Sequence, residues 1–203
     1  MSETILVTGG AGFIGRSVCG ELLKRGHKVR VLDALIEQVH GEVDGSKMLD
    51  PEVELIVGDV RNGDVVTKAL QGVDSVINLA AEVGVGQSMY AVERYTSVND
   101  VGTAVLMEKL IDRPVRRVVT ASSMSIYGEG LYRDADGRLV EDAERAQRTS
   151  DTQSWEPLDA QGRPLTPVAT PEWKKPNLAS IYALGKYVQE RTTLIMAGAY
   201  GME

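Results

Sequence analysis

The chain has 203 residues, a formal net charge of −7 and a pI near 5.0. This length suits one domain with a continuous buried core, and the acidic balance excludes a protein that binds nucleic acid through a basic surface. The single cysteine, Cys19, cannot form an internal disulfide, and no apolar stretch approaches the roughly 18 residues of a membrane span, so we expect a cytoplasmic protein without a membrane partner.

Apolar runs alternate with helical patterns from the start of the chain to residue 121. Strands are predicted at Thr4–Val7, Lys28–Asp33, Val53–Val57, Ser75–Leu79 and Arg117–Ala121. Helices are predicted at Phe13–Lys24 and Asp64–Leu70, with one or two more between Met89 and Ile111. This alternation predicts an α/β fold with a doubly wound parallel sheet and right-handed crossovers, the Rossmann arrangement.

An irregular insertion at about 129–177 interrupts the alternation, and a last helix is predicted at Ser180–Met196. The insertion carries most of the prolines and both tryptophans, and its two similar turns, Asp134–Leu139 and Asp159–Leu165, predict two small hairpins. It contains no cysteine or histidine, so the usual zinc ligands are missing and no metal is predicted. A loop of this length is more often functional than idle, which favours a lid or partner surface, with disorder as the alternative. We therefore expect one domain, 1–203, that includes this insertion.

A glycine loop joins the first predicted strand to the first predicted helix. Gly9, Gly12 and Gly15 form a G-x-x-G-x-x-G pattern, and its place between a strand and a helix is typical of a dinucleotide site. The first glycine permits a tight turn, the second lets backbone amides approach the pyrophosphate, and the third lets the helix pack on the strand. The helix N-terminus would then face the anion. The alternative is a turn without a ligand.

Asp33 ends the second predicted strand, 18 residues after Gly15. A carboxylate there would accept hydrogen bonds from the adenosine ribose and would repel a 2′-phosphate, which favours NAD over NADP despite Arg30 nearby. Asp59, after the third strand, would lie near the adenine amino group. Its alternative role is to cap the following helix.

Tyr182 and Lys186 lie one helical turn apart in the last predicted helix. An ammonium beside a phenol favours the phenolate, so Tyr182 could act as a base near neutral pH. Without the glycine loop, the alternative interpretation of this spacing is that both side chains lie on a solvated helix face. Hydroxyl side chains follow the fifth strand, where open α/β folds bind ligands, and among them we choose Ser123 to contact the reacting oxygen. The alternative is that these serines satisfy only loop backbone groups.

Together these motifs resemble the extended short-chain dehydrogenase/reductase family, in particular its nucleotide-sugar 4-epimerases such as the UDP-galactose 4-epimerase type. Further segments that carry the resemblance are Gly58–Val60, Asn78–Ala81, Asn99 with Gly102–Thr103, and Ser122–Gly128. The segment Ala81–Tyr90 and the long insertion are most similar to proteins of the dTDP-L-rhamnose 4-epimerase type.

The resemblance implies roles for individual residues. Ser123, Tyr182 and Lys186 would be catalytic, and Ser123, Ser125 and Tyr182 would contact the substrate. The residues that would bind NAD are Gly9, Gly12, Phe13, Ile14, Gly15, Asp33, Asp59, Val60, Leu79, Ala80, Ala81, Asn99, Tyr182 and Lys186.

The implied reaction is oxidation of a UDP- or dTDP-sugar at C4 by bound NAD, rotation of the transient 4-keto sugar, and return of hydride to the opposite face. Met124 and Ser125 stand where the family's dehydratases carry Asp and Glu, so dehydration is not expected. The alternatives are a reductase or dehydratase of the same family, or a non-catalytic NAD-binding fragment. The resemblance also implies a homodimer, formed through helices within Met89–Ile111 and Ser180–Met196.

Members of the family continue after the last helix into a further strand and a smaller carboxyl-terminal domain that grips the nucleotide of the substrate. The chain ends at Glu203, before both, so we expect that domain to be absent. We therefore expect an amino-terminal portion of a longer enzyme, poorly active alone, because the substrate would not be positioned.

Overall fold

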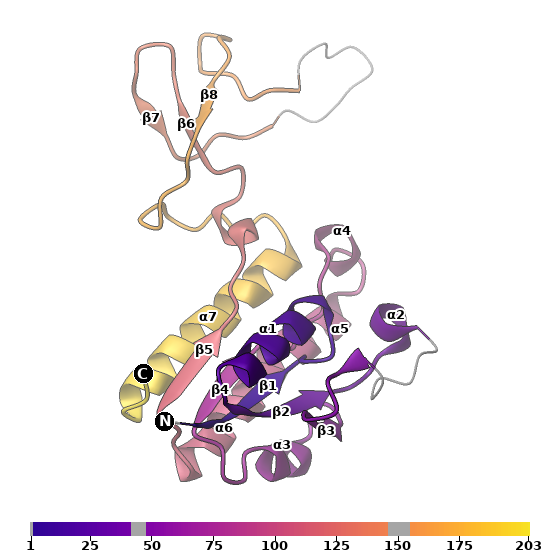
Figure 1. Ribbon diagram of the computed structural model, residues 1–203. Helices are drawn as coiled ribbons and strands as arrows, with labels where there is room; N and C mark the ends of the chain where they lie inside the picture. The colour runs from indigo at the N-terminus through magenta and orange to yellow at the C-terminus, as the bar shows by residue number, and fades with distance from the viewer. Residues whose placement is uncertain (1, 42–47, 146–154) are drawn as a thin grey trace. The chain divides into compact units, whose positions relative to one another are not determined.

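The computed structural model describes residues 2–41, 48–145 and 155–203, which form two compact units. The sheet unit comprises residues 1–123 and 180–203, and the insertion unit comprises residues 124–179 (Figure 1). The insertion unit therefore contains the predicted insertion at 129–177 and extends a few residues beyond it at each end.

Five parallel strands form the sheet of the sheet unit. They are β1 (Thr4–Thr8), β2 (Lys28–Asp33), β3 (Glu54–Val57), β4 (Ser75–Asn78) and β5 (Arg117–Thr120). Their spatial order is β3-β2-β1-β4-β5, and every neighbouring pair is parallel. The order reverses at β1, between β2 and β4, which is where ligands bind in open α/β sheets.

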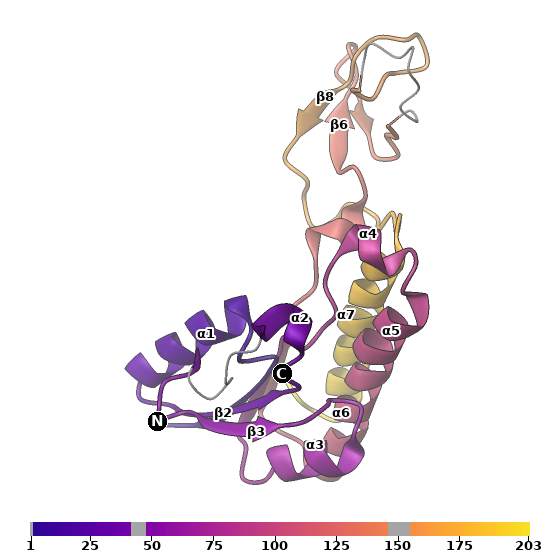
Figure 2. The ribbon, with the colours of Figure 1, turned by 90° about the vertical axis from the view of Figure 1, so that its right-hand side faces the viewer.

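The two faces of the sheet bury two separate apolar clusters. Along β1, Ile5 and Val7 belong to the cluster beneath helix α1 (Phe13–Lys24), whereas Leu6 between them belongs to the other cluster. This alternation follows from the two-residue period of a strand. The opposite face is covered by α3 (Gly63–Ala69), α6 (Gly102–Asp112) and α7 (Ile181–Ala199), as Figure 2 shows with α1 on one side and α7 on the other. The parallel sheet with helices on both faces confirms the doubly wound α/β prediction.

Helix α7 begins where its sequence predicts. Ser180 is the N-cap residue, and its Oγ accepts a hydrogen bond from the Ala183 N–H at 3.0 Å. The helix continues three residues past the predicted end at Met196. It therefore presents Tyr182 and Lys186 from its first two turns.

The predicted helical region Met89–Ile111 is divided in the structure. It contains α5 (Val92–Thr96), a π-helical turn (Ser97–Val101) and α6, and it starts at Val92 because Ala91 has a non-helical backbone (φ −108°, ψ 44°). Two short helices were not predicted, α2 (Glu37–His40) and α4 (Val85–Ser88). Each has only 4 residues, too few to give a periodic pattern.

The insertion unit begins with a 3₁₀ turn (Met124–Tyr127) and contains three short antiparallel strands. These are β6 (Leu131–Arg133), β7 (Leu139–Val140) and β8 (Thr166–Val168), in the order β7-β6-β8. Both predicted turns are present, and in each an aspartate (Asp134 or Asp159) accepts backbone N–H bonds from the residues that follow. The pairing of β6 with β8 was not predicted, because about 30 residues of irregular sequence separate the two strands.

Within the residues that the structure covers, no helix combines the length and the apolar character that crossing a bilayer requires.

Candidate active site

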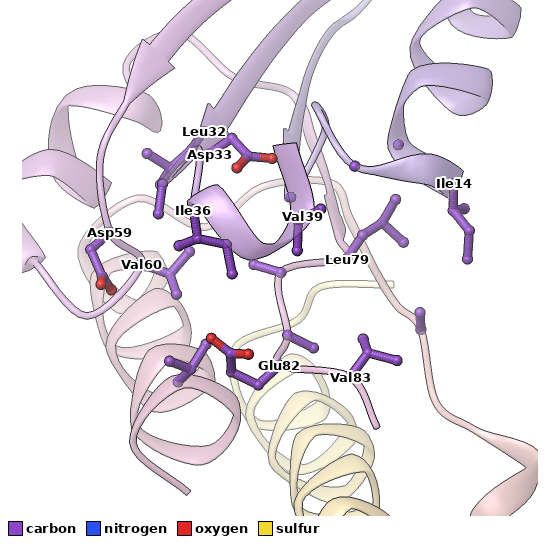
Figure 3. A pocket seen from close by; sticks show the side chains of 18 of the residues that line it. Ile14, Leu32, Asp33, Ile36, Val39, Asp59, Val60, Leu79, Glu82 and Val83 are labelled. Carbon is purple, nitrogen blue, oxygen red and sulfur yellow. The ribbon is translucent and has the colours of Figure 1, made fainter. Parts of the chain in front are cut away.

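A cavity of about 500 Å³ lies at the carboxyl edge of the sheet, and those of its lining residues that the structure describes all belong to the sheet unit. Its walls come from the glycine loop, from the residues that follow β2, β3, β4 and β5, and from α7. Figure 3 shows Asp33, Ile36 and Val39 on one wall and Glu82 and Val83 on the opposite wall. The cavity therefore lies at the point where the strand order reverses.

At two positions of the glycine loop a side chain would overlap neighbouring backbone atoms. A Cβ on Gly9 would lie 2.9 Å from the Cα of Ala80, and Gly9 also has a positive φ of 67°. A Cβ on Gly15 would lie 2.5 Å from the Cα of Gly10. Gly12 is the N-cap of α1, so the first turn of that helix faces the cavity with its unpaired backbone N–H groups. This wall of the cavity is suited to a phosphate group.

Asp33 lines the cavity and its carboxylate is held in place by two backbone groups. Oδ2 accepts a hydrogen bond from the Ala11 N–H at 3.0 Å, and Oδ1 accepts one from the Leu35 N–H at 2.9 Å. Each carboxylate oxygen keeps a further lone pair, so Asp33 can still accept hydrogen bonds from a diol.

Sequence reasoning assigned no role to His40, which lies beside Asp33 in the structure. Helix α2 brings the His40 ring into the cavity wall, with Nε2 at 3.8 Å from Asp33 Oδ1 and Nδ1 at 3.1 Å from the Ile36 carbonyl. The side chain is almost fully buried. Nothing local in the sequence signals this placement, because it depends on how the segment after β2 folds back.

Asp59 and Val60 line the cavity after β3. Arg61 pairs with Asp59, with Nη2 at 2.5 Å from Oδ2 and Nε at 2.9 Å from Oδ1, and this guanidinium lowers the pKa of the Asp59 carboxyl. The alternative role of Asp59 as a helix cap is wrong, because the side chain that caps α3 is Asn62.

The segment after β4 contributes Leu79, Ala80 and Ala81 to the cavity, the three residues that the resemblance assigns to NAD binding, together with Glu82 and Val83, which it does not assign. Asn99 does not line the cavity. Its Oδ1 accepts from the Glu82 N–H at 2.7 Å, and its Nδ2 donates to the Glu82 carbonyl at 3.1 Å. The buried Asn99 side chain therefore fixes the backbone of a cavity wall, which is an indirect contribution to the site.

Tyr182 and Lys186 both line the cavity from α7. The Tyr182 N–H donates to the Ser88 Oγ at 3.0 Å, which ties the start of α7 to α4. Lys186 is only 4% exposed, and burial lowers the pKa of its ammonium to about 8. Its Nζ donates to the Gln189 Oε1 at 2.7 Å. The cavity thus combines a phenol with an ammonium that still carries its charge at neutral pH.

The hydroxyl cluster after β5 spans the boundary between the two units. Ser122 lines the cavity and donates from Oγ to the Glu190 Oε2 at 2.7 Å. Ser123 is the next residue and the last of this segment of the sheet unit, while Ser125 lies on the 3₁₀ turn of the insertion unit. The contacts of Ser123 and Ser125 with a substrate remain predictions from the sequence.

Two further features of the described residues limit the chemistry. No group of three His, Cys, Asp or Glu side chains among them is arranged to hold a metal ion. Cys19 lies on the buried face of α1, and burial raises the pKa of its thiol to about 11, so it is not a nucleophile at neutral pH.

Comparison with known proteins gives consistent matches. The sequence profile of the NAD dependent epimerase/dehydratase family matches residues 5–151. The dTDP-L-rhamnose 4-epimerase of Burkholderia thailandensis is 33% identical over 193 residues, which cover 93% of this chain and 52% of that protein. A UDP-glucose 4-epimerase of Neisseria meningitidis serogroup C is 35% identical over 130 residues, covering 63% of this chain and 38% of that protein.

Solved structures of related proteins share the fold. The Thermus thermophilus UDP-glucose 4-epimerase in complex with NAD superposes with a TM-score of 0.71 at 27% identity, covering 98% of this chain and 52% of that one. The UDP-glucose 4-epimerase of Thermotoga maritima with UDP-glucose gives a TM-score of 0.70 at 25% identity, covering 98% of this chain and 52% of that one. The chain spans about half the length of these relatives.

Proposed function

Because the chain belongs to the NAD-dependent epimerase/dehydratase family, we propose that it binds NAD in the cavity of the sheet unit and serves the C4 epimerisation of a nucleotide-activated sugar. The observation that carries the proposal is the composition of this cavity. A glycine loop, a fixed carboxylate and a tyrosine–lysine pair line one space, although up to about 170 residues separate them in the chain.

The residues of the cavity fit a dinucleotide. Gly9 and Gly15 leave no space for a side chain, so the backbone at the start of α1 can approach a pyrophosphate closely. Asp33 would accept hydrogen bonds from the adenosine ribose, and its charge favours NAD over NADP. Tyr182 and Lys186 would lie at the nicotinamide half.

Bound NAD would supply a reversible acceptor for the hydride at C4 of the sugar. Tyr182 would take the proton of the sugar 4-hydroxyl through its phenol oxygen and later return it. The Lys186 ammonium, which lines the same cavity and carries its charge at neutral pH, would donate a hydrogen bond to the nicotinamide ribose. Ser123 would donate a hydrogen bond to the reacting oxygen, and Ser125 would contact the substrate. Asn99 would support the site by fixing the Glu82 backbone.

A dTDP-sugar is the substrate class that we propose to test first, with UDP-sugars next. The dTDP-L-rhamnose 4-epimerase of B. thailandensis aligns with 93% of this chain, which leaves little room for an unaligned insertion. The UDP-glucose 4-epimerase of N. meningitidis aligns with only 63%. The insertion therefore favours a dTDP-sugar, the substrate class of the B. thailandensis enzyme, over a UDP-sugar.

We also propose a homodimer, formed through α6 with its preceding π-helical turn and through α7. Val101 and Leu194, on these elements, are 49% and 57% exposed, and exposed apolar side chains on neighbouring helices are typical of an oligomer interface. Sedimentation velocity on wild type and Leu194→Glu tests this. A dimer that the variant dissociates is expected, and a monomeric wild type would contradict it.

The function is tested by incubating the protein, extended to its natural carboxyl terminus, with NAD and a panel of dTDP- and UDP-sugars while NMR follows the configuration at C4. Wild type and Tyr182→Phe are compared, and calorimetry measures NAD binding to both. Interconversion of one sugar pair without net NADH, lost in Tyr182→Phe although NAD still binds, is the expected result. Stoichiometric consumption of a nicotinamide cofactor would instead indicate a reductase, and NAD binding without any turnover would favour a binding role.

A further inference from the structure

Gln189 lies on α7 almost one turn after Lys186 and is only 1% exposed. Its side-chain amide makes three hydrogen bonds inside the sheet unit. Oε1 accepts from the Lys186 Nζ at 2.7 Å, and Nε2 donates to the Thr103 Oγ1 at 2.8 Å and to the Ala80 carbonyl at 3.3 Å. A buried amide with every polar atom paired rigidifies its surroundings.

The partners of Gln189 fix which way the amide points. The Lys186 ammonium can only donate, so it requires the amide oxygen, and the Ala80 carbonyl can only accept, so it requires the amide nitrogen. The orientation of the amide follows from these two contacts. No other uncharged side chain of this length offers an acceptor at one position and two donors at the other.

The nitrogen of the amide reaches the wall of the cavity. Ala80 lines the cavity directly after β4, and its own N–H donates to the Thr8 Oγ1 at 3.2 Å. Thr8 in turn donates to the Asn78 Oδ1 at 2.6 Å. Gln189 therefore joins the Lys186 ammonium to the ends of β1 and β4, beside the glycine loop.

The neutrality of this partner matters because Lys186 is buried. A carboxylate at position 189 would form an ion pair with the ammonium and would neutralise its charge. It would also place an acceptor against the Ala80 carbonyl, where the structure has a donor. An amide holds the ammonium in place and leaves its charge available.

We propose that Gln189 is a positioning residue, which aims the Lys186 ammonium from the ends of β1 and β4 toward the cavity without neutralising its charge. The role toward NAD and the sugar rests on the proposed function, whereas the control of the charge of Lys186 does not.

The charge of Lys186 can be measured in the protein without NAD through the pH dependence of its stability. Burial lowers the pKa of Lys186 to about 8, whereas an unfolded lysine has a pKa of about 10.4. Between these values the unfolded chain binds more protons, so the free energy of unfolding contains a contribution from Lys186 that rises with pH. Other ionisable groups of the protein also contribute to the pH dependence of stability, so variants are compared with wild type at each pH.

The experiment is urea unfolding of wild type, Gln189→Glu, Gln189→Met and Thr193→Val at several pH values between 7 and 10. In Gln189→Glu the free energy of unfolding should no longer rise with pH through Lys186, because the carboxylate raises the pKa of Lys186 toward its ordinary value. In Gln189→Met the free energy of unfolding should begin to rise at a lower pH than in wild type, because the ammonium loses its acceptor and the pKa of Lys186 falls further. Thr193→Val is the matched control, since Thr193 donates to the Gln189 backbone carbonyl from the same helix and should lower stability equally at every pH.

A second set of variants assigns the effect to Lys186. With Lys186→Met in the background, proteins with glutamine and with methionine at position 189 should have the same pH dependence of stability. If each Gln189 variant instead shifts stability by one constant amount at every pH, Gln189 is only a packing residue and the proposal is overturned.

Calorimetric NAD binding links the role to the site. Gln189→Met should weaken NAD binding by about tenfold, the usual effect of losing a hydrogen bond to a charged group. Gln189→Glu should also weaken it, because its carboxylate neutralises the ammonium and has no donor for the Ala80 carbonyl, while Thr193→Val should not. Unchanged NAD affinity in both Gln189 variants would overturn the positioning role. The expected stability and affinity changes in a protein that epimerises no sugar would reject the proposed function and leave the positioning of Lys186 intact.

Discussion

Lys186 is a charged residue that the folded protein keeps buried, and this has a cost in stability at neutral pH. Its folded pKa of about 8 lies below the unfolded value, so the proton is held more tightly by the unfolded chain. Relative to Lys186→Met, wild type should therefore gain stability as the pH rises from about 8 toward about 10, by up to about 3 kcal/mol. Urea unfolding of both proteins at pH 7 and pH 10 checks this. A stability difference that does not change with pH would contradict a buried ammonium.

Asp33 should set the choice between NAD and NADP. Asp33→Asn keeps the shape of the side chain and an acceptor for one of its two backbone donors, but removes the charge. NAD binding should weaken and the preference for NAD over NADP should fall by about tenfold, because the 2′-phosphate no longer meets a carboxylate. Calorimetry with both cofactors measures this.

Asp59→Asn is the control for Asp33, because Asp59 lines the same cavity but pairs with Arg61. It should leave the ratio of the two affinities unchanged. An equal ratio in Asp33→Asn and wild type would show that Asp33 does not select the cofactor.

Among individual residues, the sequence predicts those whose place in the site depends on the local backbone. Gly9 and Gly15 follow from the steric demands of a strand–turn–helix, and Tyr182 and Lys186 from the spacing of one helical turn. Glu82, His40 and Gln189 carry no such signal. Gln189 contacts residues 86 and 109 positions earlier, and the Glu82 backbone is held by Asn99, 17 positions later. His40 reaches Asp33 and Ile36 only because the segment after β2 folds back.

Helix α1 offers a direct test of how closely it must approach the glycine loop. A Cβ on Gly15 would lie 2.5 Å from backbone atoms of Gly9 and Gly10, whereas a Cβ on Gly20 of the same helix meets nothing within 4 Å. Gly15→Ala should therefore destabilise the protein by several kcal/mol and abolish NAD binding, as α1 is pushed off the loop. Gly20→Ala should instead stabilise it by about 1 kcal/mol through helix propensity.

Thermal unfolding and NAD titration of these two variants check the prediction. Equal stability of Gly15→Ala and Gly20→Ala would show that the loop and α1 can separate without cost.

Elements with strong periodicity were predicted closely, and elements set by tertiary packing were not. Helix Phe13–Lys24 and strand Lys28–Asp33 have the predicted bounds, because apolar spacing and Gly26 define them. The division of Met89–Ile111 was not predicted. Its π-helical turn buries Asn99 against the segment after β4, and this contact has no counterpart in the local pattern.

For the molecule as a whole, the location of the cavity predicts that the insertion unit is dispensable for NAD binding, since each lining residue within 2–41, 48–145 and 155–203 belongs to the sheet unit. The ends of the insertion lie close together, because the Asn177 N–H donates to the Ile126 carbonyl at 2.8 Å. Replacing residues 129–176 by a short glycine linker should leave the NAD dissociation constant within about threefold, since loop length changes closure entropy only weakly.

Calorimetry on the shortened protein tests this, with circular dichroism to establish that it is folded. A folded variant that no longer binds NAD would show that the insertion contributes to the cofactor site.

The sheet unit is discontinuous in sequence, and this sets the order in which a ribosome can complete it. β1 cannot pair with β4 until about 70 further residues have been synthesised. The 56 residues of the insertion unit are then synthesised before α7, the last element that lines the cavity. The loops and strand ends that would hold NAD thus precede the helix that carries Tyr182 and Lys186. Contacts of such long sequence separation slow folding, and until α7 docks, the apolar sheet face that it covers stays open to chaperones.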